Sequence, residues 1–149
     1  MTNRKQGHGM RCHKVGLCIR GHRGNPKVRA SFIRFARWLR RRQSFPTLLP
    51  VYLVGGDQLR TIAGDKCTAS FFGPHSRRNV PYIRIATGNF LSLEKESGRD
   101  GALAAFLTSL AHEIIHYQQW LRGMQLTEQG VVRKAAQIVR DYAETVDRP

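Results

Sequence analysis

The chain has 149 residues and a mass of 17.0 kDa, which is enough for one domain with a modest core and too little for a two-domain enzyme. Its formal net charge is +15. Residues 1–56 contain 13 of the 25 Lys and Arg residues and no Asp or Glu. Residues 57–149 contain the other 12 basic residues and all 10 acidic residues, so they are nearly neutral. The strongly basic residues 1–56 favour nucleic acid as a partner, and such binding should weaken as the salt concentration rises. An anionic membrane surface or a merely solvated charged face is the alternative, since no named nucleic-acid-binding motif is present.

The sequence also indicates the compartment. No apolar run is long enough to span a membrane, and the first residues lack the apolar stretch of a secretory signal. The three cysteines, Cys12, Cys18 and Cys67, are an odd number and so a poor disulfide framework. We therefore expect a cytoplasmic protein with reduced thiols and no membrane partner.

Residues 1–26 are polar, basic and rich in glycine, and we interpret them as a flexible N-terminal arm before a folded domain at 27–149. Within this arm, Cys12, His13, Cys18 and His22 could suggest a zinc site. Their spacing contains neither a CxxC pair nor an HxxxH pair, which argues against a zinc module there.

The folded domain is predicted to be α+β. Apolar residues at helical spacing, after Pro26, predict a first helix from Lys27 to about Gln43, and Pro46 and Pro50 then mark a linker. Short apolar runs predict strands, of which the second and third should form an antiparallel hairpin. Two further helices complete a domain whose helices pack against one sheet. The predicted strands are 51–54, 68–72 and 82–86, and the later helices are 101–122, with Asp100 as N-cap and Gly123 as stop, and 127–146.

The segment His112-Glu113-Ile114-Ile115-His116 is an HExxH pentad inside the second of these helices. Residues four apart lie on one helical face, so both imidazoles can reach one metal ion while Glu113 reaches a water bound to it. An ordinary buried helix whose histidines satisfy their neighbours is the alternative. Burying two histidines and a glutamate without partners is costly, which favours zinc bound by His112 and His116, with Glu113 as general base.

A catalytic zinc generally takes three protein ligands, and no histidine follows His116. The later acids are Glu128, Asp141, Glu144 and Asp147. On a helix from Thr127 to Val146, Glu128 would lie at the centre of the apolar face, whereas Asp141 and Glu144 would face solvent. Glu128 is therefore the expected third ligand. The alternative is that Glu128 only favours the helix N-terminus through the helix dipole.

The pentad, the preceding Leu110-Ala111, the trailing Tyr117-Gln118-Gln119-Trp120 and the upstream hairpin together resemble the small zincin-fold metallopeptidases of the gluzincin and SprT-like kind. The resemblance covers about residues 27–144 and implies a three- or four-stranded sheet beside the active-site helix, with an edge strand that receives an extended peptide. Two features depart from it. SprT-like proteins use a later histidine, which this chain lacks, and small gluzincins place a glutamate further into the last helix, where Val131 and Val132 stand.

These features predict a zinc-dependent endopeptidase whose targets are proteins bound to nucleic acid. Tyr117, Tyr142 and His75 are candidates for stabilising the oxyanion, and residues 68–72 or 82–86 for the peptide-binding edge. One alternative is a non-catalytic nucleic-acid-binding protein that retains a zincin scaffold. Another is a peptidase with a dedicated partner, such as a regulator or toxin, whose charge serves solubility only. The sequence gives no oligomeric state.

Overall fold

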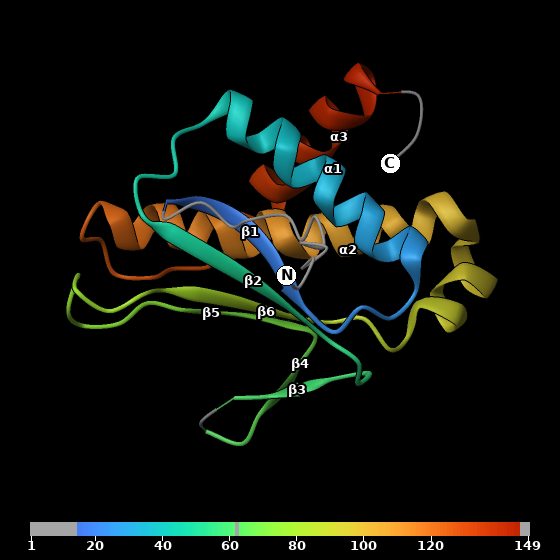
Figure 1. Ribbon diagram of the computed structural model, residues 1–149, viewed down its shortest axis with the longest axis horizontal. Helices are drawn as coiled ribbons and strands as arrows, with labels where there is room; N and C mark the ends of the chain where they lie inside the picture. The colour runs from blue at the N-terminus through green and yellow to red at the C-terminus, as the bar shows by residue number, and fades with distance from the viewer. Residues whose placement is uncertain (1–14, 62, 147–149) are drawn as a thin grey trace, which may run out of the picture.

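A computed structural model describes residues 15–61 and 63–146, and it shows a mixed α+β domain, which confirms the predicted class. The elements follow in the order β1 (Gly16–Gly21), α1 (Pro26–Arg42), β2 (Leu48–Val54), β3 (Leu59–Arg60), β4 (Lys66–Cys67), β5 (Ala69–Phe72), β6 (Tyr82–Ala86), α2 (Phe90–Leu121) and α3 (Val131–Thr145). Figure 1 shows α1 and α3 above the sheet and the small β3–β4 hairpin projecting below it.

The main sheet has four strands in the order β1-β2-β6-β5. Strands β1, β2 and β6 are parallel, whereas β5 pairs antiparallel with β6, so the predicted hairpin is confirmed. Strand β5 is an edge strand, and β6 is not, because β6 is paired on both sides. Of the two candidate edges for peptide binding, only β5 therefore has a side on which no strand pairs within residues 15–61 and 63–146.

Strand β1 differs from the prediction, since residues 16–21 fall inside the stretch interpreted as a flexible arm. Leu17 and Ile19 are buried in the main core, and β1 runs in register with β2 from Leu48 to Leu53. The apolar run of this strand is only three residues long and stands between basic and glycine-rich segments, so it gave no periodic signal. The rest of the predicted arm up to residue 14 lies outside the described residues.

Helix α1 begins one residue before its predicted start. Asn25 caps it by accepting a hydrogen bond from the Lys27 backbone N–H at 2.9 Å, and Pro26 occupies the first turn, where a missing N–H costs nothing. Its apolar stripe, including the fully buried Phe32 and Phe35, packs into one core with the inward residues of the sheet. The arginines of its last turn remain exposed.

Helix α2 is longer than predicted, because residues 90–97 form a helical segment before the expected start. The two segments meet at Gly98, whose φ of 75° and ψ of 171° are open almost only to glycine. Asp100 therefore lies within the helix and is not its N-cap. The predicted stop is confirmed, since Gly123 adopts a left-handed φ of 69° directly after the helix and donates its N–H to the Trp120 carbonyl.

The structure also bears on the expected membrane spans and cysteine thiols. In the residues that the structure describes, none of the helices combines the length and apolar character needed to cross a bilayer. Cys18 is disulfide-bonded, so the expectation of a reduced thiol is wrong there, and Cys67 is free. The cysteine argument for a cytoplasmic setting therefore loses its support.

Candidate metal centre

The two histidines of the pentad lie on the face of α2 that looks toward the loop before α3. Their rings are 5.0 Å apart between centroids, as expected for residues one helical turn apart. The His116 side chain is 8% exposed and that of His112 is 24% exposed. One ring is thus held within the protein while the other borders solvent.

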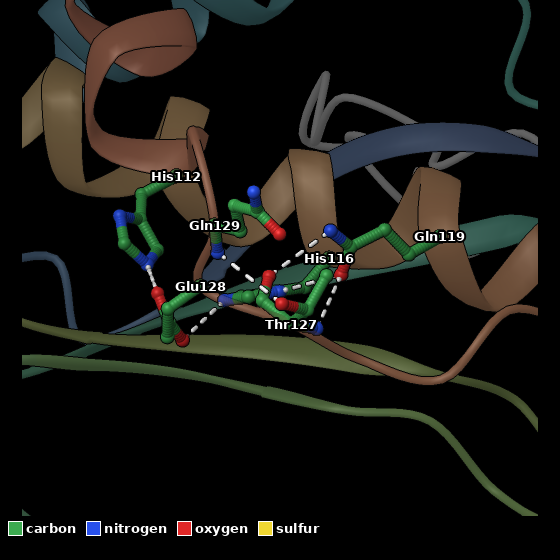
Figure 2. Close-up of polar contacts among 6 residues, drawn as sticks. All are labelled: His112, His116, Gln119, Thr127, Glu128 and Gln129. Carbon is green, nitrogen blue, oxygen red and sulfur yellow. Dashed lines mark hydrogen bonds and ion pairs between the residues drawn. The ribbon is translucent and has the colours of Figure 1, made fainter.

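Glu128 lies between the two rings, as Figure 2 shows. Its Oε2 is 2.9 Å from His112 Nε2, and its Oε1 is 2.8 Å from His116 Nε2. These three residues form a group whose ligand atoms all lie within 4.8 Å of one another. In the described residues no other cluster of three or more histidine, cysteine or acidic side chains has this geometry.

Glu128 reaches this position by a route that the sequence did not predict. Helix α3 begins at Val131, after Gly130 in the left-handed region, so Glu128 belongs to the preceding loop and not to an apolar helical face. Its side chain is 71% exposed, so the prediction that it points into the core is wrong. Among the other acids, Asp141 pairs with Arg42 at 4.0 Å and Glu144 is exposed, while Asp147 lies outside the described residues.

Gln119 fastens this loop to the HExxH helix. Its side-chain amide donates to the Thr127 carbonyl at 3.1 Å, and its Oε1 accepts the Thr127 backbone N–H at 3.2 Å. The same Oε1 lies 3.0 Å from His116 Nδ1. One side chain therefore orients a histidine and also positions the residue next to Glu128.

These contacts determine the tautomer of His116. Since the main chain of Thr127 fixes which end of the Gln119 amide is oxygen, His116 Nδ1 must carry a proton to donate to it. The lone pair of a neutral His116 is then on Nε2, the atom that faces Glu128 and His112.

The same donor set suits a metal ion. Two imidazole nitrogens and a carboxylate are ligands that zinc favours, and a metal-binding histidine usually donates its second N–H to a neighbouring acceptor, as His116 does. A tetrahedral zinc with bonds of about 2.0–2.1 Å separates its ligand atoms by roughly 3.4 Å, which lies between the short contacts and the 4.8 Å limit found here. The described residues therefore fit zinc with small side-chain adjustments.

Glu113 follows His112 in the chain, and the two residues line the same cavity. Glu113 is 8% exposed and lines an open cavity of about 480 Å³ together with His112, with Thr108 and Ser109 of α2, and with residues 66–69 of β4 and β5. Burial raises the pKa of Glu113 to about 7; the His116 charge opposes this rise, and the Glu128 charge adds to it. A carboxyl group of this pKa can both accept and return a proton near neutral pH.

None of the three oxyanion candidates lines this cavity. The Tyr117 hydroxyl is 2.7 Å from Thr47 Oγ1 in the connection between α1 and β2, and Tyr117 is fully buried. The Tyr142 ring packs edge-on against Phe35, with centroids 5.0 Å apart. His75 is exposed in the loop between β5 and β6 and does not line the cavity.

Gln119 and Thr127 are the functional residues that sequence reasoning missed. Their pairing joins a side chain on one helix to main-chain atoms eight residues later, and a loop has no periodicity that would reveal such a contact. One signal was present: Gln119 is three residues after His116, the spacing that places it on the same helical face.

No protein-family profile, curated protein or solved structure matches the chain.

Proposed function

We propose that the chain is a zinc-dependent metallopeptidase of the HExxH type that acts on proteins associated with nucleic acid. The observation that carries the proposal is the convergence of His112 Nε2 and His116 Nε2 on the Glu128 carboxylate, with the buried Glu113 carboxyl beside them at an open cavity. The resemblance to small zincin-fold peptidases supports it, since a helix, a sheet with an antiparallel edge strand and an HExxH helix occur here in the implied order.

His112, His116 and Glu128 would hold the ion, and Gln119 would keep the His116 lone pair directed at it. When bound, zinc supplies Lewis acidity toward a carbonyl oxygen and toward water. Glu113 accepts a proton from the attacking water and donates it to the departing amine, for which a pKa near neutrality is suited. The free side of β5 offers main-chain groups to an extended substrate next to the cavity.

The metal content of purified protein tests the ligand set. We expect one zinc per chain in the wild type after dialysis against a weak chelator, and its loss in His112→Ala and Glu128→Ala. Asp141→Ala is the matched control, because this carboxylate follows the pentad in the chain but pairs with Arg42. A wild type without metal, or a Glu128→Ala variant that keeps it, would contradict the ligand set.

Hydrolysis of an unfolded protein substrate tests the reaction. Glu113→Gln is expected to retain zinc and lose hydrolysis, since the amide cannot accept the water proton. A zinc-loaded wild type that cleaves no protein, alone or with nucleic acid, would favour the second candidate, a non-catalytic nucleic-acid-binding protein on the same scaffold. The net charge of +15 is the observation that supports this candidate.

A further inference from the structure

The face of the main sheet that is turned away from the core carries an unusual set of side chains. Side chains alternate along a strand, so each strand contributes to two faces. The inward residues of β2 and β6, such as Val51 and Ile83, belong to the core that the helices cover. Their outward neighbours Tyr52, Tyr82 and Arg84 are outside that core and remain partly exposed.

The strand register places these outward residues in rows across the sheet. Arg20 of β1 is opposite Tyr52, Tyr52 is opposite Arg84, and Arg84 is opposite Ser70 of β5. In a second row, Tyr82 is opposite Phe72. The first row therefore alternates arginine and tyrosine across β1, β2 and β6, and the second row pairs two aromatic residues. These strands lie side by side in Figure 1.

The aromatic residues of this face form a continuous group. The rings of Phe72 and Tyr82 are stacked with centroids 5.1 Å apart, and Tyr52 meets Tyr82 edge-on at 6.0 Å. Phe72, at the free edge of the sheet, is 40% exposed, which is high for a phenylalanine paired in a strand. The group thus offers accessible aromatic surface on a rigid support. We call Tyr52, Phe72, Tyr82 and Arg84 the outer platform.

The charge of this face is positive. The four strands of the main sheet contain two charged residues, Arg20 and Arg84, and no acid. Within the outer platform, Arg84 Nη2 donates to the Arg60 carbonyl at 3.1 Å, which holds the guanidinium in place. Of the ion pairs found between described residues, none includes Arg84. A guanidinium without a counter-ion next to open aromatic rings suits a ligand with both anionic and planar groups.

We infer that the outer platform binds single-stranded nucleic acid, with bases stacked on its aromatic rings and phosphates near its arginine. Aromatic side chains interleaved with basic residues are the arrangement that binds single strands without sequence preference. A duplex is disfavoured, because its bases are already stacked on one another and cannot lie on the rings. The inference names a surface for the nucleic-acid part of the proposed function and does not rest on the peptidase part, whose site lies on the other side of the sheet.

Fluorescence anisotropy of a labelled oligothymidylate with the full chain tests the platform. Tyr82→Leu and Phe72→Leu each remove one ring and keep an apolar side chain, and each is expected to raise Kd by about 5- to 100-fold. Tyr82→Phe retains the ring and should bind like the wild type. Arg84→Gln should make the dependence of log Kd on log salt less steep by about 0.7.

A control variant outside the outer platform completes the test. Leu91→Ala, at a residue 66% exposed at the start of α2, should bind like the wild type. Glu113→Gln should bind the oligonucleotide unchanged even if it abolishes hydrolysis, so failure of the peptidase proposal and of this inference can be told apart. Circular dichroism and thermal melting show whether each variant is folded. Folded platform variants with wild-type Kd would overturn the inference, as would binding to phosphatidylserine vesicles without binding to the oligonucleotide.

Discussion

The buried Glu113 carboxyl makes the stability of the metal-free protein depend on pH. Burial raises its pKa from 4.5 to about 7, so the folded chain holds a proton that the unfolded chain releases. A raised folded-state pKa contributes stability below pH 4.5 that is lost as pH rises through 7. At 1.36 kcal/mol for each pH unit between these values, the loss amounts to about 3 kcal/mol.

Urea unfolding of metal-free wild type and Glu113→Gln, from pH 4.5 to 8.5, measures this loss. The amide has no proton to release, so the variant should gain about 3 kcal/mol of unfolding free energy relative to wild type across this range. Comparing the two proteins removes the contributions of ionisable groups that do not interact with Glu113; His116, whose charge lowers the pKa of Glu113, is the exception. Glu144→Gln, which removes an exposed carboxylate from α3, is the matched control for loss of a solvated charge.

A difference between wild type and Glu113→Gln that stays constant with pH would refute the reasoning, since it would mean that burial does not alter the proton affinity of the carboxyl. Zinc provides a second check. A cation next to the carboxyl favours its ionised form, so the zinc-loaded protein should show a smaller pH-dependent difference than the metal-free protein.

Three further substitutions test individual contacts. Gln119→Ala is expected to weaken zinc affinity about 10- to 100-fold in competition with a chelating dye, because it removes the hydrogen-bond partner of His116. Gln129→Ala is the control and should leave zinc affinity unchanged. Equal affinities of the two variants would show that the Gln119 contacts do not contribute to zinc binding. Phe35→Ala should lower the unfolding free energy by about 3–5 kcal/mol in urea, and a smaller loss would mean that the core collapses around the cavity. Gly98→Ala should cost about 1–3 kcal/mol by the same assay, unless the break in α2 closes.

The helices and most of the inner strands could be predicted because their signals are local. Residues 48–50 are the exception, since Pro50 indicated a linker but lies within β2, paired with β1. The stripe of α1, the HExxH face of α2 and the alternation of β6 each repeat over at least one full period within the element. Strand β1 has only Leu17, Cys18 and Ile19 as its apolar run, and it is a strand because β2 is beside it. A contact between residues about 30 positions apart leaves no periodic trace in the sequence.

Glu128 lies at the histidines by a different path from the one that the helical period indicated. The helical period placed it on an inward face of a helix beginning at Thr127, but the pairing of Thr127 with Gln119 and the left-handed Gly130 keep this stretch out of α3. The loop nevertheless delivers the carboxylate to the histidines. The sequence could indicate only that a metal ion bound by the two histidines would need a third ligand. The path of the loop depends on side-chain contacts that the sequence does not reveal.

The two proposed sites share strand β5, since Ala69 lines the cavity beside Glu113 and Phe72 belongs to the outer platform. On β5, Phe71 packs against Tyr117 of the HExxH helix, while the next residue, Phe72, belongs to the outer platform. A polypeptide paired with the free side of β5 would therefore lie at the border between the metal centre and the bound nucleic acid. If both proposals hold, a protein attached to the bound single strand would lie near the cavity, because one short strand carries residues of both sites.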